Sequence, residues 1–425
     1  MQTRRDFFRK AAALSAGLLL QDMIIGCTSA RSPTILVVSG WQDVNIGDIA
    51  HTPGLLHVLE TFLPGSKIIL WKPSRSEQVH ELLQASFPAV RIIYGSVDSH
   101  KNTDNREVAD AVNEADIMLH GSGPFLVGAD HLDFWIRQSG EKPFGVFGAT
   151  LENPGEYHLG ILRKASFVFT RETLSIDHLK RAGIEGDHIR FAPDATFFMH
   201  IRDDRKAGRF LEENGLEERK FICVIPRLRI TPYYKFRPDN AGWSDERIAF
   251  VEELNQRTKE QDHAKMREAM VAWVRETGNK VLVCPEMTYQ VDIMDELLID
   301  PLPVDVKSYV IKRGYWMPDE AASVYGKTHT VLSFECHSPI IAAATGTPFF
   351  YLRQPEDTIK GQMYYDLGFD DWTFEIEQTR GARIAGSLRE VWTDYPKALA
   401  RVRANMDKVG EIYSDRVDMM KSLTG

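Results

Sequence analysis

The sequence predicts an α/β protein built from two domains, each a mostly parallel sheet covered by helices. Short apolar, β-branched runs alternate with stretches of helical periodicity, and this alternation is typical of parallel sheets. The alternation stops at a polar stretch over 199–220 and then restarts. A length of 425 residues leaves room for two such domains and a further segment.

The first domain is predicted over 33–200. Its apolar runs lack polar alternation, which indicates strands buried on both faces. The predicted strands are Thr34–Ser39, Lys67–Trp71, Ala89–Tyr94, Ile117–His120, Phe144–Phe147, Phe167–Thr170 and Ile189–Phe191. The predicted helices are His51–Phe62, Glu77–Ser86, Asn105–Ala115 and Leu174–Ala182.

The second domain is predicted over 220–378, and an amphipathic helical tail follows over 385–422. The predicted strands are Phe221–Ile225, Lys280–Cys284, Val306–Ile311, Thr330–Phe334 and Pro348–Leu352. The predicted helices are Asp262–Thr277, Val291–Leu298, Asp319–Tyr325 and Pro339–Thr345.

Residues 1–27 are interpreted as an export signal rather than as part of the fold. The pair Arg4-Arg5 precedes an apolar run over 11–20, which is the pattern of a twin-Arg signal. The run is too short to span a bilayer, and Cys27 ends a stretch that resembles a lipobox. We therefore expect export by the twin-Arg route to the periplasm, with a lipid anchor at Cys27 as the one membrane contact. A short amphipathic N-terminal helix is the alternative.

Charge and cysteine content exclude several functional classes. The formal net charge is −9, and no stretch is dominated by Lys and Arg, which argues against general nucleic-acid binding. Cys223, Cys284 and Cys336 show neither a disulfide framework nor metal-ligand spacing, so buried free thiols are expected. No cofactor and no metal site are predicted, and the sequence gives no indication of the oligomeric state.

Candidate site residues of the first domain follow predicted strands, because ligands of open α/β sheets bind at the carboxyl ends of the strands. Asn45-Ile46-Gly47-Asp48 follows the first strand, with Asp48 either an N-cap or a substrate ligand. Gly121-Ser122-Gly123 follows another strand and would allow a close backbone approach to a ligand. Arg171 and Pro193-Asp194 follow two more, with a structural ion pair and a turn as their alternative roles.

The second domain supplies the sharpest candidates. Arg227 follows its first strand, where a guanidinium could bind a carboxylate or phosphate in bidentate fashion. The segment from Glu335 to Ser338 lies between a strand and a helix of small residues. His337 is expected at the helix N-terminus, where the helix dipole favours a neutral imidazole that can act as a base. Glu335 could orient this histidine or act as an acid, and a structural helix cap is the alternative for His337.

At this point the chain resembles the polysaccharide pyruvyl transferase family over roughly residues 34–375. The segments that carry the resemblance are Asn45-Ile46-Gly47-Asp48, similar to N-x-G-D; Gly121-Ser122-Gly123, similar to a glycine-rich turn; Arg171-Glu172 with Ser175, Leu179 and Gly183-Ile184; Pro193-Asp194; and Ser333–Pro348, similar to S-x-R-x-H before a helix and G-x-P. Lys360 is similar to a late family lysine.

The resemblance implies two Rossmann-like domains in a GT-B-like arrangement and transfer of a pyruvyl group from phosphoenolpyruvate to two hydroxyls of a sugar. Carried over by position, Arg227 would hold the donor and His337 would handle the proton, at a groove shared by the two domains. One position departs from the family pattern, because Glu335 stands where the family has an arginine. A carboxylate ~4 Å from an anionic donor opposes its binding by ~1–4 kcal/mol.

Two other functions remain open on the same scaffold. Glu335 and His337 could activate water against a glycan ketal or glycosidic bond, which would make the protein a hydrolase. A non-catalytic glycan-binding lipoprotein is the third hypothesis, since aromatic side chains can stack on sugars. The aromatic candidates are Trp41, Trp71, Tyr233, Tyr234, Trp243, Tyr315 and Trp316.

Overall fold

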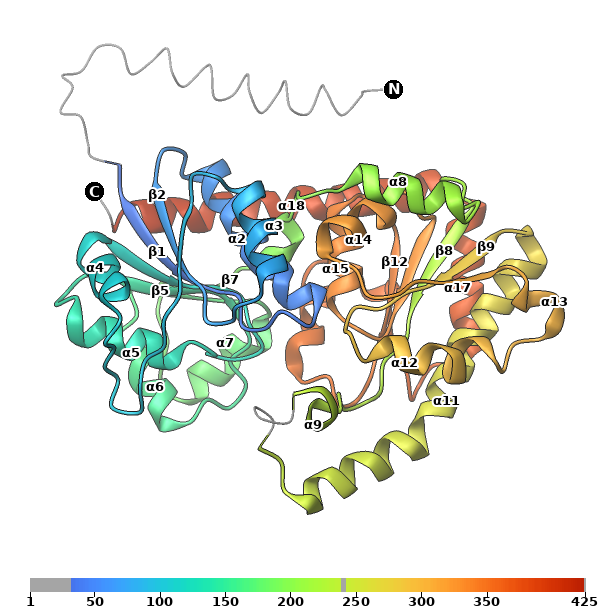
Figure 1. Ribbon diagram of the computed structural model, residues 1–425, viewed down its shortest axis with the longest axis horizontal. Helices are drawn as coiled ribbons and strands as arrows, with labels where there is room; N and C mark the ends of the chain where they lie inside the picture. The colour runs from blue at the N-terminus through green and yellow to red at the C-terminus, as the bar shows by residue number, and fades with distance from the viewer. Residues whose placement is uncertain (1–31, 238–241, 424–425) are drawn as a thin grey trace, which may run out of the picture. The chain divides into compact units, whose positions relative to one another are not determined.

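The computed structural model describes residues 32–237 and 242–423, and from Pro33 onward these residues fall in one compact unit (Figure 1). The twin-Arg segment and Cys27 lie outside the described residues. Among the described helices, none combines the length and the apolar character that a bilayer-spanning helix needs.

In the described part of the chain, the first half forms a seven-stranded parallel sheet in the order β3-β2-β1-β4-β5-β6-β7. Its strands are β1 (Thr34–Val38), β2 (Lys67–Trp71), β3 (Arg91–Ile93), β4 (Ile117–His120), β5 (Phe144–Ala149), β6 (Phe167–Thr170) and β7 (Ile189–Phe191). Its helices are α2 (Ile46–Phe62), α3 (Glu77–Ser86), α4 (Arg106–Glu114), α5 (Ala129–Gln138), α6 (Glu156–Leu162), α7 (Thr173–Arg181) and the short η2 (Ala195–Phe198), and α8 (Asp204–Glu213) leads to the second half.

The second half repeats the arrangement, with a six-stranded parallel sheet among the described residues in the order β10-β9-β8-β11-β12-β13. Its strands are β8 (Phe221–Ile225), β9 (Lys280–Val283), β10 (Val310–Lys312), β11 (Thr330–Ser333), β12 (Phe349–Arg353) and β13 (Thr373–Glu375). Its helices are α9 (Tyr233–Phe236), α11 (Asp245–Thr277), α12 (Gln290–Met294), η3 (Asp295–Ile299), α13 (Val304–Lys307), α14 (Pro318–Tyr325), α15 (His337–Ala344), η4 (Ile359–Gly361), α16 (Gln362–Asp366), η5 (Asp370–Trp372), α17 (Gly381–Thr393) and α18 (Tyr395–Lys421).

Both sheets therefore contain the Rossmann strand order 3-2-1-4-5-6, which β7 extends by one strand in the first sheet, and the predicted fold class of two Rossmann-like parallel-sheet domains is confirmed. The strands are buried apolar runs because helices cover both faces of each sheet. One apolar core on the first sheet, with side chains such as Ile49 and Phe197, continues into the core of the second sheet. The other face of the first sheet has a separate core around Trp135 and Leu162.

The C-terminal tail is two helices rather than one. The chain breaks at Asp394, whose carboxylate accepts a hydrogen bond from Lys397 N (3.3 Å) and so caps the start of α18. Helix α18 then returns to the first half of the chain, where it contacts α2 and η2. Tyr413 of this helix is fully buried, and its hydroxyl donates to the carbonyl of Asp194 (2.7 Å).

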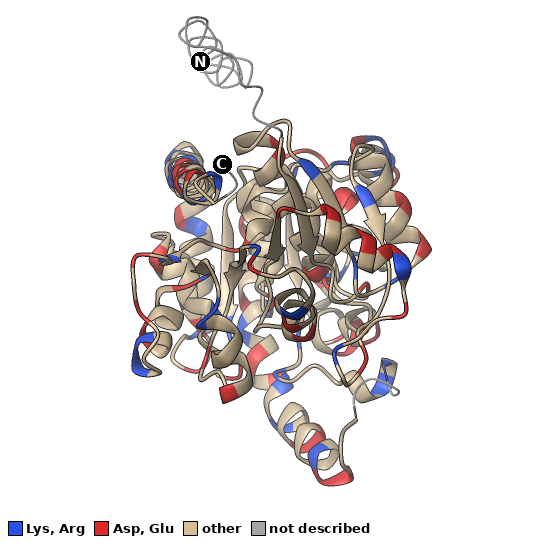
Figure 2. Cartoon of the chain, turned by 90° about the vertical axis from the view of Figure 1, so that its left-hand side faces the viewer, with Lys and Arg blue, Asp and Glu red and all other residues tan. Residues whose placement is uncertain are grey.

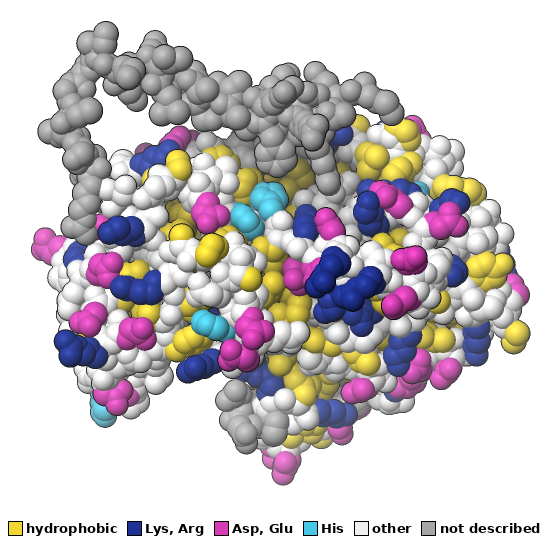
Figure 3. Space-filling model, turned by 45° about the horizontal axis from the view of Figure 1, so that its top comes forward, with side chains coloured by type: hydrophobic (Ala, Val, Ile, Leu, Met, Phe, Trp, Pro, Cys, Tyr) yellow, Lys and Arg dark blue, Asp and Glu magenta, His cyan; other side chains and the backbone are white. Residues whose placement is uncertain are grey.

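The surface and the cysteines agree with the composition. Figures 2 and 3 show Lys and Arg interspersed with Asp and Glu over the described residues. Cys223, Cys284 and Cys336 are free and buried, as expected for structural thiols. Trp71 and Trp316, two of the aromatic candidates for sugar stacking, are buried to 0% and 2% exposure, so neither offers a face to a sugar.

Candidate active site

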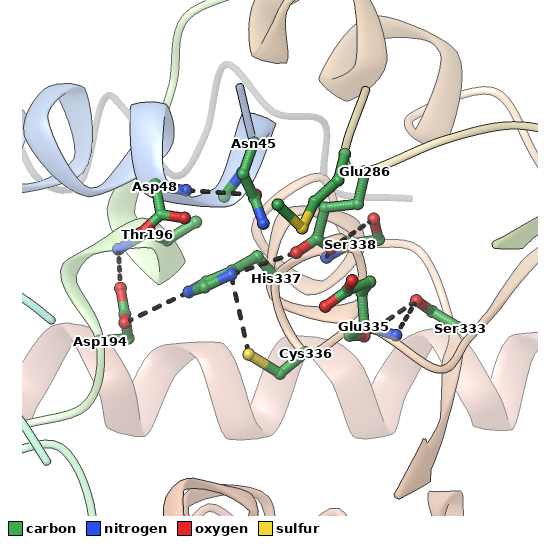
Figure 4. Close-up of polar contacts among 12 residues, drawn as sticks. Asn45, Asp48, Asp194, Thr196, Glu286, Ser333, Glu335, Cys336, His337 and Ser338 are labelled. Atoms are coloured by element: carbon green, nitrogen blue, oxygen red, sulfur yellow. Dashed lines mark hydrogen bonds and ion pairs between the residues drawn. The ribbon is translucent and has the colours of Figure 1, made fainter. Parts of the chain in front are cut away.

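The loops after β1, β7, β9 and β11 meet at one place, and the predicted residues Asn45, Asp194 and His337 lie there. The sheet orders reverse between β1 and β4 and between β8 and β11, and ligands of such sheets bind beside the reversal. Two loops from different halves pair there, since Ile46 N donates to Glu286 O (2.9 Å) and Thr288 N donates to Val44 O (3.1 Å). This pairing holds the two strand-end edges against each other. Figure 4 shows Asn45 and Asp194 of the first half and Glu286 of the second half around His337.

Asn45 and Gly47 set the start of α2. Asn45 Oδ1 accepts from Gly47 N (2.6 Å) and Asp48 N (3.4 Å), so Asn45 is the N-cap and the alternative that Asp48 caps the helix is wrong. Gly47 lies against the ring of His337, and a Cβ on Gly47 would be 2.2 Å from His337 Cγ. The two motifs that carry the family resemblance, 290 residues apart in the sequence, therefore contact each other directly through a glycine that leaves room for the ring.

His337 contacts a second histidine across the two halves. Its Nε2 is 2.9 Å from the Nε2 of His51, which comes from α2. His51 Nδ1 is 2.7 Å from the carbonyl oxygen of Ser122, which can only accept, so the proton of a neutral His51 is on Nδ1. The Nε2 of His51 then has a lone pair, and a proton on His337 Nε2 completes the contact.

Glu286 fixes the other side of the His337 ring. Its carboxylate accepts from Ser338 N (2.6 Å) and Ser338 Oγ (2.8 Å), and it lies 3.2 Å from His337 Nδ1. An ionised carboxylate only accepts, so His337 Nδ1 also has a proton. The expectation of a neutral His337 is wrong in this structure, because carboxylates on two sides outweigh the helix dipole.

The acid–base properties of the pair follow from these contacts. Burial opposes a charge on His337, but the Cys336 sulfur, Asp194 and Glu286 outweigh it and raise the pKa of His337 well above its ordinary value. Burial lowers the pKa of His51, although Asp194 acts in the opposite direction. His337 is therefore the charged member of the pair and His51 the neutral one.

Asp194 lies beside both rings, and Arg171 holds it there. Asp194 is fully buried, with Oδ2 at 3.5 Å from His51 Nε2 and 3.8 Å from His337 Nε2. Arg171 Nη1 donates to Oδ2 (3.0 Å), and Thr196 N donates to Oδ1 (3.0 Å). Arg171 is itself only 1% exposed, so it lies beneath the site as a partner of Asp194.

Arg227 lies in a second cluster, beside Glu335 and Asp357. Its Nη1 hydrogen-bonds Asp357, and its Nε lies 3.3 Å from Glu335 Oε2. Lys360 Nζ is 3.3 Å from the same carboxylate of Asp357. Two cations thus face two carboxylates. Glu335 forms an ion pair with the guanidinium of Arg227, the group that the family resemblance assigns to donor binding.

Glu335 connects this cluster to His337. Gln290 Nε2 donates to Glu335 Oε1 (2.7 Å), and Gln290 Oε1 accepts from Glu286 N (2.7 Å), whose carboxylate contacts His337. Burial raises the pKa of Glu335 to about 7, although the charge of Arg227 opposes this. The Glu335 carboxyl is therefore part of one hydrogen-bonded network with His337.

The structure places the predicted residues in three groups. Asn45, Asp48, His337 and Ser338 lie where the loops of the two halves meet, and Glu335 lies with Arg227 and Lys360 in the second cluster. Arg171 and the turn over 121–123 support Asp194 and His51 from the first half. Arg227 and His337 follow β8 and β11, two paired strands of the second sheet, so both lie in the second half, where the sequence placed them. The residues that face His337 from the first half are Gly47, His51 and Asp194.

The glycine-rich turn supports the site through its backbone. The carbonyl of Ser122 accepts from His51 and from Trp41 Nε1 (2.6 Å), and its hydroxyl accepts from Ala195 N (3.0 Å). Sequence reasoning missed His51, Glu286 and Asp357. Glu286 had a usable signal, because Pro285-Glu286 follows a strand just as Pro193-Asp194 and Pro226-Arg227 do.

Known proteins resemble this chain both in sequence and in fold. The family model described as polysaccharide pyruvyl transferase matches residues 45–354. No protein of curated function matches the chain.

Several solved structures share the fold of this chain. UDP-GlcNAc 2-epimerase from Neisseria meningitidis bound to UDP-GlcNAc is 14% identical with a TM-score of 0.52, over 92% of this chain and 100% of that chain. A glycosyltransferase from Rickettsia africae is 12% identical with a TM-score of 0.55, over 91% and 99%. Anabaena HepE in complex with UDP and glucose is 11% identical with a TM-score of 0.53, over 92% and 98%. These likenesses show a GT-B-like arrangement.

Proposed function

Because the chain belongs to the polysaccharide pyruvyl transferase family, whose members modify glycans, we propose that it transfers a pyruvyl group from phosphoenolpyruvate to two hydroxyls of a carbohydrate. The observation that carries the proposal is the contact between the two family motifs. Gly47 of the first motif lies against the ring of His337 of the second, and the network of Glu335 leads from there to Arg227 and Lys360.

The reaction requires a cationic donor site and a group that carries a proton. One acceptor oxygen bonds to C2 of the donor while the methylene C3 takes up a proton. The bond from C2 to the phosphate oxygen breaks, phosphate leaves, and the second acceptor oxygen closes the ketal. Of the two hydroxyl protons, one balances the new methyl group and the other leaves with phosphate.

Arg227 and Lys360 are the cations that we assign to the donor. A guanidinium binds phosphate or carboxylate in bidentate fashion, and an ammonium adds a point charge. In this structure both cations contact Asp357, and Glu335 also occupies Arg227. A dianionic donor must therefore displace Glu335 from Arg227, which couples donor binding to the state of the carboxyl that replaces the family arginine.

Glu335 and His337 are the ionisable groups that we assign to the proton. Glu335 is 4% exposed and contacts the donor-binding guanidinium, and His337 has a proton on each ring nitrogen. Asn45, Asp48 and Ser338 shape the part of the site that the acceptor would occupy. Arg171 and the turn over 121–123 hold Asp194 and His51 in place rather than contacting substrate.

Donor binding tests the proposal. Phosphoenolpyruvate should raise the melting temperature of the purified protein, because a ligand of the folded state stabilises it. The rise should disappear in Arg227→Ala and persist in the control Arg275→Ala, whose side chain is 54% exposed. Absence of any rise in the wild type at millimolar donor would refute the proposal.

Glu335→Gln separates binding from chemistry. The variant removes the carboxylate that competes for Arg227, so the donor Kd should fall by about tenfold or more, given the ~1–4 kcal/mol between such charges. Turnover should fall at the same time, because the carboxyl proton is lost. Release of pyruvate into water without an acceptor would instead favour the hydrolase, and glycan binding without turnover would favour the binding protein.

We also propose export by the twin-Arg route, with lipidation at Cys27. Replacing Arg4 and Arg5 together by Lys should leave the unprocessed precursor in the cytoplasm. Cell fractionation with an antibody against the chain measures this, and unchanged export of the double variant would contradict the assignment.

A further inference from the structure

Three potential ligand atoms converge at the junction of the two halves. His51 Nε2, His337 Nε2 and Asp194 Oδ2 are separated by 2.9, 3.5 and 3.8 Å. All three side chains are buried, and they come from α2, from the start of α15 and from the loop between β7 and η2. Among the described residues, this is the one group of histidine, cysteine and acidic side chains whose potential ligand atoms lie close enough together to share a metal ion.

The triangle has the size that a small divalent cation requires. The circle through its three corners has a radius of about 2.0 Å, as the three separations dictate. A point near the plane of the triangle is therefore about 2.0–2.1 Å from each atom, which is the length of a zinc–nitrogen or zinc–oxygen bond. No movement of the backbone is needed to bring the three atoms within range of one ion.

Each proposed ligand is held by a second group, and these contacts leave His51 Nε2, His337 Nε2 and Asp194 Oδ2 as the atoms that can bind an ion. His51 Nδ1 donates to Ser122 O (2.7 Å), and His337 Nδ1 donates to Glu286 Oε1 (3.2 Å). Metal-binding histidines characteristically donate their second nitrogen to a carbonyl or carboxylate in this manner. The second oxygen of Asp194 accepts from Thr196 N (3.0 Å), and Arg171 takes one lone pair of Oδ2, which leaves the other for an ion.

A single proton shared by the two histidines leaves one of the three ligand atoms without a hydrogen bond from either ring. It joins the two ring nitrogens but leaves Asp194 Oδ2 at 3.5 and 3.8 Å from them, at or beyond hydrogen-bond range. We propose that His51, Asp194 and His337 bind one divalent transition-metal ion of the zinc class. Two imidazole nitrogens and one carboxylate oxygen suit zinc, cobalt or iron better than magnesium or calcium, which prefer oxygen ligands alone.

The proposed ion has two consequences for the site. Three protein ligands leave coordination positions open, as in catalytic rather than structural zinc sites. The ligands come from both halves of the chain, so the ion would join them at the same place as the contact of Gly47 with His337. With the ion bound, His337 is a ligand, and Glu335 is the group that carries the proton. Metal binding does not depend on the proposed pyruvyl transfer.

The experiment measures Co²⁺ binding to the full chain after treatment with a chelator. Wild type should bind one Co²⁺ per chain, with visible d–d absorption and with one equivalent by elemental analysis after dialysis. His51→Gln should weaken binding by about 100-fold or more, since loss of a direct ligand costs at least as much as loss of a group behind one. The glutamine oxygen can still accept from His337 Nε2, so the fold and the hydrogen bond are kept.

His57→Gln is the matched control, because His57 lies on the same helix outside the cluster. It should bind Co²⁺ like the wild type, and Asp194→Asn should bind weakly. The proposal is overturned if the wild type binds no Co²⁺, or if it binds Co²⁺ no more tightly than His51→Gln does. Donor-dependent stabilisation is recorded on the same samples, so a failure of metal binding is distinguished from a failure of the proposed function.

Discussion

Gly47 determines how closely the two family motifs approach each other. A methyl group at this position would overlap the His337 ring at 2.2 Å, and the ring is held on its other sides by Glu286 and His51. The ring cannot move away without breaking one of these contacts. A single glycine hydrogen is thus a condition for the geometry of the whole site.

Gly47→Ala should abolish turnover and donor-dependent stabilisation, and it should lower the free energy of unfolding by about 1–3 kcal/mol, as overpacking does. The control is Gly160→Ala, because a Cβ at Gly160 meets no atom within 4 Å. That change lies in α6 and should leave activity unchanged and raise stability by about 0.5–1 kcal/mol. Activity assays and denaturant unfolding measure both, and an active Gly47→Ala would contradict the close contact.

Glu172 gives a pH dependence of stability that is separate from the site chemistry. Its carboxyl is fully buried and accepts from Thr150 Oγ1 (2.9 Å) and Ser175. Burial raises its pKa to about 7 from 4.5, although Arg171 acts in the opposite direction. Between these two values the folded chain binds a proton that the unfolded chain does not. The free energy of unfolding therefore falls as pH rises through this window.

Glu172→Gln should remove the loss of unfolding free energy that the wild type shows as pH rises. The variant should be more stable than wild type by about 1–3 kcal/mol at about pH 8, and the difference should shrink as pH falls from about 7 to 4.5, below which both states of the wild type carry the proton. Urea unfolding at a series of pH values measures the difference. A difference that is the same at every pH would show that Glu172 does not titrate in this window.

At the residue scale, the sequence predicted site residues that directly follow strands. It missed the residues that contact them from distant parts of the chain. Arg227, Glu335 and His337 were found because each follows an apolar strand. His51 was missed because its partner lies 286 residues away, and no local pattern indicates that contact. Asp357 was missed for the same reason, since its role comes from Arg227, 130 residues earlier.

At the scale of the element, helix starts were the main source of error. Helix α2 begins at Ile46 rather than His51, because the amide oxygen of Asn45 caps it and overrides the weak helix propensity of Gly47. Helix α11 begins at Asp245 rather than Asp262, with Ser244 as its cap. The strand predicted over Val306–Ile311 is partly helix α13, because Pro303 starts a helical turn and leaves β10 only three residues.

The cap of α2 can be tested directly. Asn45→Ala should lower the free energy of unfolding by about 1 kcal/mol, because two amide groups of the first turn lose their acceptor. Asn45→Ser should restore most of this, since serine caps helices nearly as well. Thermal unfolding of both variants measures the effect, and equal stability of Asn45→Ala and wild type would argue against the capping role.

At the scale of the whole molecule, the two sheets were predictable and their connection was not. Strand alternation indicated two Rossmann-like domains, but the return of α18 to the first half depends on contacts that only the folded chain shows. Tyr413 of α18 is fully buried and makes a polar contact with the first half of the chain. Its hydroxyl donates to Asp194 O (2.7 Å), and its ring packs against Phe147 and Phe198.

Tyr413→Phe should lower the free energy of unfolding by about 1–2 kcal/mol, since it takes the hydroxyl donor away from a buried carbonyl. Tyr309→Phe is the control, because Tyr309 is 36% exposed and should show little change. Denaturant unfolding measures both variants. Equal stability of Tyr413→Phe and wild type would mean that α18 is held by its apolar contacts alone.

The central claim is that the family motifs of the two halves form one site that binds an anionic enol phosphate at Arg227 and Lys360. Phosphorus NMR of phosphoenolpyruvate in the presence of the protein tests it most directly. The resonance of the donor should shift or broaden with wild type, and it should stay at its free position with Arg227→Ala and with Lys360→Ala. A donor spectrum that is identical with and without the wild-type protein would contradict the account.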